Sequence, residues 1–177
     1  MEEKEKRAQE ILQYPTPYKT RGFEEVVKEH IKHQLKDENG EDISTTMPTK
    51  GSKNSAGYDF YSKENIVLRP GEKHVFWTDV KSYMLADEVL KMYVRSSTGI
   101  KKDLILRNQT GIIDSDYYSN PDNDGNIGIC LKNDSDKNQE IMIGERIVQG
   151  IFHKYLLADD IISEEERDGG IGSTNKK

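Results

Sequence analysis

Cysteine is almost absent from this sequence: among 177 residues only Cys130 occurs, so the chain cannot form an intramolecular disulfide. Cys130 lies in an apolar run, where we expect a buried structural thiol rather than a nucleophile. Long hydrophobic runs are also missing, because no segment approaches the roughly 20 apolar residues of a membrane span. The first residues lack the apolar core of a signal peptide. These absences predict a protein of the reducing cytoplasm with no membrane partner.

Several common nucleotide and metal motifs are missing as well. No Gly-x-x-x-x-Gly-Lys segment occurs, which excludes a P-loop enzyme. The four histidines do not cluster with cysteine or acidic residues at metal-ligand spacing, and we expect His30 and His33 on a solvated face. Residues 120–125 have the first half of a calcium-loop spacing, but Leu131 stands where the twelfth-position acidic ligand is required. We therefore interpret residues 118–124 as a polar extended hairpin.

Basic residues are fewer than acidic residues in this sequence. The formal net charge is -6, and such a surface repels phosphate backbones, which argues against a nucleic-acid partner. A nucleotide substrate remains compatible with this balance, because it needs only a local basic pocket.

What the chain does have is a succession of short apolar runs. The charged segment 2–13 predicts a short helix, and in residues 21–35 the apolar positions fit helical spacing better than strand alternation. Residues 36–56 are polar and loop-like. From Tyr58 onward, runs rich in Val, Ile, Tyr and Phe recur between turn residues, at 66–68, 75–77, 90–94, 104–106, 112–113, 127–131, 141–143 and 147–152. Many short strands at regular spacing predict an all-β sandwich or barrel.

Five short clusters of polar and glycine residues carry the chemistry. In chain order they are Ala56–Phe60, Arg95–Ser97, Gly111–Tyr117, Gly144–Gln149 and Gly169–Thr174. Taken singly, each cluster is a weak signal. Together, and in this order, they resemble the five motifs of the trimeric dUTPase family (deoxyuridine 5′-triphosphate nucleotidohydrolases) of the bacterial and phage type. The resemblance covers about residues 53–174.

This resemblance implies an architecture and a reaction. The fold would be an all-β jelly roll or distorted β-barrel over residues 21–163, with an N-terminal helical extension (1–20) and a flexible tail (164–177) carrying the fifth motif. The chain would hydrolyse dUTP to dUMP and pyrophosphate by Mg²⁺-assisted attack of water on the α-phosphorus. It would act as a homotrimer in which each site takes motifs one, two and four from one chain, motif three from a second and motif five from a third.

The same resemblance assigns catalytic roles. Asp114 would hold and activate the attacking water, a task that suits a carboxylate base. Ser96 would donate to the oxygen between the α- and β-phosphates, and Arg95 and Gln149 would bind phosphate oxygens, for which the planar guanidinium is well shaped. Asp59 would support the Mg²⁺ ion indirectly, through its water shell.

Selectivity and closure are assigned in the same way. Asn108 would read the uracil edge, and Tyr117 would lie against the deoxyribose, leaving no room for a 2′-hydroxyl. In the tail, Arg167 and Ser173 would clamp the γ-phosphate. Ile171 stands where most family members have an aromatic residue, so it can cover the base by dispersion but offers no π face. The remaining substrate contacts implied by the motifs are at Ser97, Gly111, Ile113, Gly172 and Thr174.

Two other functions share this fold and stay open at this level. A dCTP deaminase would carry an arginine soon after Arg-Ser-Ser and a catalytic glutamate, whereas Thr98-Gly-Ile follows here and Asp114 and Tyr117 match the hydrolase. A regulatory protein of the dUTPase fold would bind a repressor or another partner in a nucleotide-dependent way, through the 118–124 insertion or the N-terminal helix. A pure binder would not need Asp114, Tyr117, Ser96 and Gln149 together.

Overall fold

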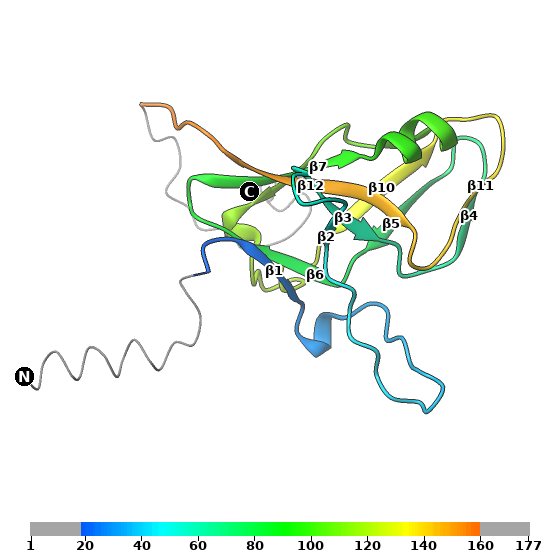
Figure 1. Ribbon diagram of the computed structural model, residues 1–177, viewed down its shortest axis with the longest axis horizontal. Coiled ribbons are helices and arrows are strands. Elements are labelled where there is room, and N and C mark those ends of the chain that lie inside the picture. Colours follow the sequence, from blue (N-terminus) through cyan, green and yellow to red (C-terminus); the bar gives the residue numbers. More distant parts are fainter. Residues whose placement is uncertain (1–18, 160–177) are drawn as a thin grey trace, which may run out of the picture.

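The computed structural model describes residues 19–159, which form an all-β jelly roll with three short helical turns among its strands (Figure 1). The predicted fold class is therefore confirmed. The predicted N-terminal helix and the tail with its fifth motif lie outside the described residues. No helix within residues 19–159 is long and apolar enough to cross a membrane.

The strands are β1 (Gly22–Glu25), β2 (Thr49–Lys50), β3 (Tyr58–Tyr61), β4 (Ile66–Leu68), β5 (Lys73–Trp77), β6 (Val80–Tyr83), β7 (Glu88–Val94), β8 (Leu104–Leu106), β9 (Gly111–Asp114), β10 (Gly128–Asn133), β11 (Gln139–Ile141) and β12 (Arg146–Lys154). The helical turns are η1 (Lys28–His30), η2 (Ser97–Lys101) and η3 (Ser115–Tyr117).

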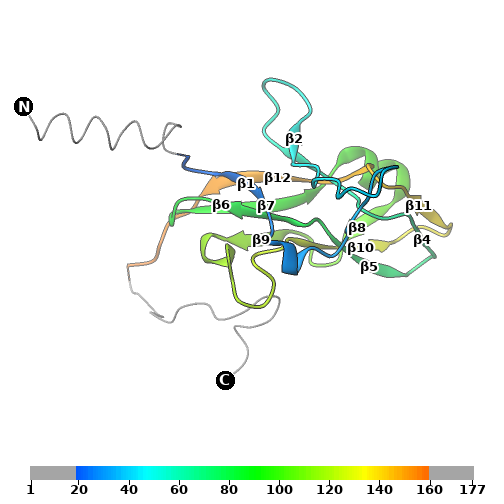
Figure 2. The ribbon, with the colours of Figure 1, turned by 90° about the horizontal axis from the view of Figure 1, so that it is seen from below.

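The strands pair in four antiparallel groups. The largest sheet has the order β2-β3-β12-β7-β9, and a second has the order β5-β10-β8. Two further pairs are β1-β6 and β4-β11. In the side view of Figure 2, β12 and β7 lie on one side of the molecule and β5 and β10 on the other. Antiparallel sheets with one face on a shared core explain the short alternating runs of the sequence.

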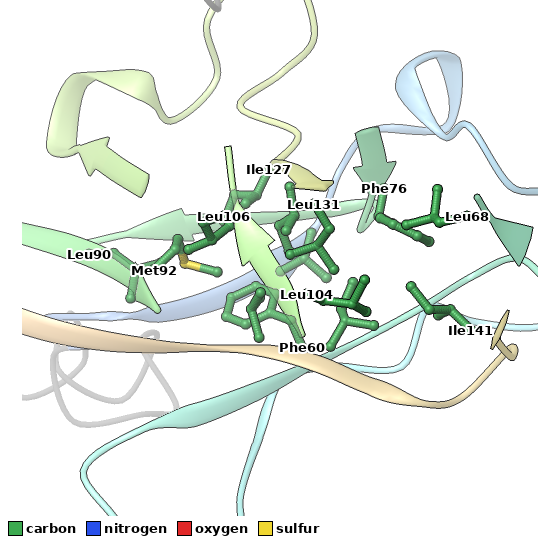
Figure 3. Packing of buried hydrophobic residues seen from close by; sticks show 14 residues of the cluster. Phe60, Leu68, Phe76, Leu90, Met92, Leu104, Leu106, Ile127, Leu131 and Ile141 are labelled. Carbon is green, nitrogen blue, oxygen red and sulfur yellow. The ribbon is translucent and has the colours of Figure 1, made fainter. Parts of the chain in front are cut away.

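Large aliphatic and aromatic side chains from both sheets fill the space between them (Figure 3). Phe60, Leu90, Met92, Leu104 and Leu131 are each at most 2% exposed, and full burial of one such side chain stabilises the fold by about 1.5–3 kcal/mol.

Strand β10 shows how alternation sorts its residues between the two faces. Ile129 and Leu131 point into the core, whereas Cys130 between them is only partly buried. The expectation of a buried thiol was wrong because the position between two core residues of a strand faces away from the core.

Residues 21–35 form strand β1 and the single turn η1 instead of the predicted helix. Tertiary pairing overrides the local pattern, because β1 pairs antiparallel with β6 from Gly22 opposite Tyr83 to Glu25 opposite Val80. Phe23 also packs against three aromatic rings, with centroid distances of 5.3–5.4 Å. These contacts with distant residues decide a conformation that helical spacing alone did not predict.

The carboxylate of Asp79 holds the chain that follows β1. It accepts hydrogen bonds from the backbone N–H groups of Lys32 (2.8 Å) and His33 (3.1 Å), and from the side-chain amide of Asn126 (3.0 Å). The His33 ring lies 3.1 Å from the same carboxylate, so His33 is partly buried and not on the solvated face that was expected. Burial acts to raise the pKa of Asp79, but the hydrogen bonds from His33, Lys32 and Asn126 outweigh burial and lower that pKa below its ordinary value.

Residues 118–124 are a series of tight turns, so the predicted extended hairpin was wrong. Asn120, Asn123 and Asp124 are buried, with exposed fractions of 4%, 8% and 7%. The Asp124 carboxylate accepts hydrogen bonds from Lys81 Nζ (2.8 Å) and from the Val27 backbone N–H (2.7 Å). A polar segment can pack inward in this way because its own side chains and backbone satisfy one another's hydrogen bonds.

Candidate functional site

Three of the five motifs meet at the centre of the largest sheet. Strand β12 lies between β3 and β7, and its Gln149 pairs with Asp59 on β3 and with Tyr93 on β7. Arg95 follows directly after the end of β7. The first, second and fourth motifs therefore converge in a single chain, although 87 positions separate Asp59 from Arg146.

The carboxylate of Asp59 forms ion pairs with two arginine side chains. Its Oδ1 accepts a hydrogen bond from Arg95 Nε at 2.7 Å, and its Oδ2 accepts one from Arg146 Nη1 at 3.2 Å. The carboxylate is nearly buried, with 9% of its side chain exposed, whereas 24% of Arg95 and 48% of Arg146 remain exposed. One carboxylate against two guanidinium groups leaves a local excess of positive charge, although the whole chain is acidic. This local excess of positive charge can attract phosphate oxygens.

Arg146 was missed by the sequence reasoning. It lies inside the fourth cluster, Gly144–Gln149, but only Gln149 was assigned a role there. The available signal was a basic residue within a motif already identified. What the sequence could not reveal was the irregular register between Arg146 and Val148, where β12 bulges against β3 beside Asp59.

The absence of a side chain at Gly57 leaves space for the side chain of Gln149. A Cβ atom on Gly57 would collide with Gln149 Oε1, at a distance that real Cβ contacts do not show. Gln149 is partly buried, and any side chain at position 57 would displace its amide. The close approach explains why a glycine precedes Tyr58 and Asp59 in the first motif.

The turn after β7 presents the second motif. The Gly99 N–H donates to Arg95 O at 2.8 Å, so the chain turns between Arg95 and Gly99 as it enters η2. Ser97 Oγ accepts a hydrogen bond from Arg95 Nη1 at 3.2 Å, and Ser96 beside it is exposed. Ser96 is thus an exposed residue that directly follows an arginine whose guanidinium is already oriented.

The third motif begins along β9, the edge strand of the same sheet, and Asp114 lies at the end of β9 that is farther from Arg95. Asp114 ends β9 and pairs with Val89 near the start of β7, whereas Arg95 lies six residues farther along. At a strand rise of roughly 3.3 Å per residue, Asp114 and Arg95 are about 20 Å apart within one chain. The structure therefore does not bring Asp114 to Arg95, Ser96 and Gln149 in a single copy of the chain.

Asn108, which precedes the third motif, and the other residues of that motif divide between surface and interior. Asn108 is exposed on the turn between β8 and β9, and Gly111 pairs with Met92, where a Cβ atom would lie 2.9 Å from the Met92 Cβ. Ile113 is partly buried against the core. Tyr117 is 6% exposed, and its hydroxyl donates to Asn126 O at 2.9 Å. Arg167, Ile171, Gly172, Ser173 and Thr174 lie outside the described residues.

Comparison with known proteins identifies relatives over most of the chain. The family model described as dUTPase matches residues 44–175. The chain is 42% identical over 158 residues to the deoxyuridine 5′-triphosphate nucleotidohydrolase of Lactococcus lactis, and the match covers 88% of this chain and 98% of that protein.

Solved structures agree with these sequence matches. The crystal structure of dUTPase from Streptococcus mutans is similar with a TM-score of 0.65 and 38% identity, covering 78% of this chain and 99% of that one. A mutant of the Staphylococcus bacteriophage 80alpha dUTPase, in its structure with dUpNHpp, is similar with a TM-score of 0.60 and 26% identity, covering 89% of this chain and 99% of that one.

Proposed function

The chain belongs to the dUTPase family, and from this premise we propose that it hydrolyses dUTP to dUMP and pyrophosphate. The observation that carries the proposal is the meeting of three motifs around Asp59, Arg95, Arg146 and Gln149, inside a region that the family model matches throughout. The regulatory alternative and the deaminase alternative are not favoured, because the relatives named above are nucleotidohydrolases and dUTPases.

The two arginines held by Asp59 would receive the phosphates. A guanidinium already fixed by a carboxylate needs little reorganisation when charge develops on phosphate oxygens during the reaction. Ser96 would donate from its exposed hydroxyl to the oxygen between the α- and β-phosphates, and Gln149 would orient a neighbouring oxygen. Asp114 would accept the proton of the attacking water as that water adds to the α-phosphorus and pyrophosphate leaves.

Three copies of the chain would assemble each site. The separation of about 20 Å between Asp114 and Arg95 supports this arrangement, because the base and the phosphate-binding residues of one copy cannot act on one nucleotide. A threefold ring repeats one heterologous contact and can place the third motif of one copy beside the second motif of the next. The tail residues Arg167, Ile171, Gly172, Ser173 and Thr174 would complete the site from the third copy.

Magnesium would enter this site mainly through the substrate. Within residues 19–159, no group of three His, Cys, Asp or Glu side chains could hold a metal. The lack of such a cluster is still compatible with Mg²⁺, because this ion keeps several waters and is commonly bound by substrate phosphates with few protein ligands. When bound, Mg²⁺ would neutralise charge on the triphosphate. Asp59 would act toward it only through water, since both of its oxygens contact guanidinium groups.

The organisation of the chain follows from the same proposal. Residues 21–163 would form the β-barrel, 164–177 the tail that covers the nucleotide, and 1–20 an N-terminal extension. The family match runs to residue 175, which supports including the tail in the functional unit. We also propose a cytoplasmic location.

Pyrophosphate release from a panel of nucleotides tests the reaction directly. With Mg²⁺ present, we expect rapid release from dUTP and much slower release from three other nucleotides. UTP would bring a 2′-hydroxyl against Tyr117, dTTP would add a methyl group to the base, and dCTP would leave groups matched to the uracil edge unpaired. EDTA should abolish release, and added Mg²⁺ should restore it. Equal rates for all four nucleotides, or ammonia release from dCTP, would contradict the proposal.

Tyr117 is expected to set the discrimination between dUTP and UTP. Replacing it by alanine should remove the ring that excludes a 2′-hydroxyl, and should lower the ratio of kcat/KM for dUTP over UTP by about tenfold, the effect of a lost steric contact of about 1.4 kcal/mol. The measurement is steady-state kinetics with both nucleotides. A variant that folds and keeps the parent ratio would remove Tyr117 from this role.

A further inference from the structure

The segment 118–126 folds back over Tyr117. Its turns bring Gly125 so close that a Cβ atom there would lie 2.7 Å from Tyr117 O. Gly125 also has a φ of +80°, a conformation that glycine adopts without strain. The segment therefore packs directly against the backbone of the third motif.

Three asparagines of the segment hold both ends of Tyr117. Asn120 Nδ2 donates to Tyr117 O at 3.1 Å, and Asn123 Nδ2 donates to the Tyr117 hydroxyl at 2.8 Å. The hydroxyl donates in turn to Asn126 O at 2.9 Å. The three asparagines are 4%, 8% and 0% exposed, so these bonds are shielded from water.

The orientation of the Asn123 amide follows from its other contacts. Its Oδ1 accepts hydrogen bonds from Asn120 Nδ2 (2.8 Å) and from the Gly125 backbone N–H (3.0 Å). With its oxygen engaged by two donors, the amide must present its NH₂ group to the Tyr117 hydroxyl. A hydroxyl that accepts from one side and donates to the other is held at one point, and the ring to which it is attached cannot shift without breaking a buried hydrogen bond.

We propose that Asn123 is a positioning residue for Tyr117, and that it thereby helps to determine the discrimination against ribonucleotides. The proposal rests on the proposed role of Tyr117 beside the deoxyribose. Asn123 does not touch the nucleotide; it keeps the ring where an added 2′-hydroxyl would collide with it. A ring free to shift by a fraction of an ångström would admit UTP more readily.

The test uses Asn123→Ser in the full chain. A serine hydroxyl can still accept from the Gly125 N–H and keep the turn, but it is too short to reach the Tyr117 hydroxyl. We expect kcat/KM for dUTP to change little and the dUTP-to-UTP ratio to fall about fivefold, as expected for a ring that is released but not removed. In a Tyr117→Phe background the same substitution should change the ratio no further, because the hydrogen bond is already absent.

Asn133→Ala provides the matched control. Asn133 is another fully buried asparagine, and its amide donates to Leu68 O and Lys137 O, away from Tyr117. This variant should lower the thermal midpoint and leave the ratio unchanged. An unchanged ratio in Asn123→Ser, an additive effect in the Tyr117→Phe background, or an equal fall in Asn133→Ala would each overturn the inference.

The outcome also separates this inference from the proposed function. If Tyr117→Ala lowers the ratio while Asn123→Ser does not, only the role of Asn123 fails. If neither variant changes the ratio, Tyr117 does not set the discrimination, and the role inferred for Asn123 is overturned with it. Should Asn123→Ser not fold, Tyr117→Phe breaks the same hydrogen bond from the other partner, and an unchanged ratio in that variant overturns the inference.

Discussion

Asp114→Asn is expected to lower kcat for dUTP by about 10³-fold, the middle of the range for loss of a general base. Asparagine keeps the size of the side chain and can still hydrogen-bond the water, but it cannot accept the proton as the water attacks. Binding of dUTP should stay close to the parent value, because Asp114 is assigned to the water and not to the nucleotide. Single-turnover kinetics and calorimetric binding of a non-hydrolysable analogue measure the two effects separately. A parent-like kcat would show that another group is the base.

Mixed trimers extend this prediction to the assembly. Asp114→Asn and Arg95→Ala should each be nearly inactive alone, because each lacks one half of the chemistry. Co-refolded in equal amounts, they should regain activity, since about a quarter of the sites then combine an intact second motif from one copy with an intact third motif from its neighbour. Refolding Asp114→Asn alone is the control. No recovery from the mixture would mean that a single copy supplies both motifs, against the separation of about 20 Å along β7.

Asp59→Asn is expected to lower kcat/KM for dUTP by about 10²-fold, the scale of a misplaced phosphate-binding group. The amide can accept from one guanidinium, but its NH₂ group then faces the other, so Arg95 and Arg146 lose their common anchor. The loss of negative charge would strengthen attraction for phosphate in general, yet correct placement of the two guanidinium groups matters more for a reaction that depends on geometry. Steady-state kinetics at several Mg²⁺ concentrations measure the effect.

Asp87→Asn is the matched control for that variant. Asp87 also pairs with a basic side chain, Lys154 at 2.9 Å, but both partners are largely exposed and lie on the surface. Exposed pairs contribute little, so kcat/KM should stay at the parent value. A parent-like Asp59→Asn enzyme would remove the anchoring role. A higher requirement for Mg²⁺ in Asp59→Asn, with no such change in Asp87→Asn, would indicate that Asp59 also acts on the metal's water shell.

The sequence predicted the fold class because strand alternation is a local property. Runs such as Leu104–Leu106 and Gly128–Asn133 carry the period of a half-buried strand whatever their partners are. Local patterns failed where partners decide the outcome. Residues 21–35 form a strand and a single turn because the strand pairs with β6 and packs against three aromatic rings. Residues 118–124 pack inward because their asparagines form hydrogen bonds with one another.

The sequence by itself determined which family this chain joins, since five motifs in order carry that information without any coordinates. Only the tertiary structure decided that Asp59 is shared by Arg95 and Arg146, that Asn123 holds Tyr117, and that Asp114 stands apart from the residues it is proposed to serve. The physical reason is that spacing along a chain specifies side-chain types and local conformation. Strand pairing, by contrast, brings residues from distant positions together or keeps them at opposite ends of one sheet.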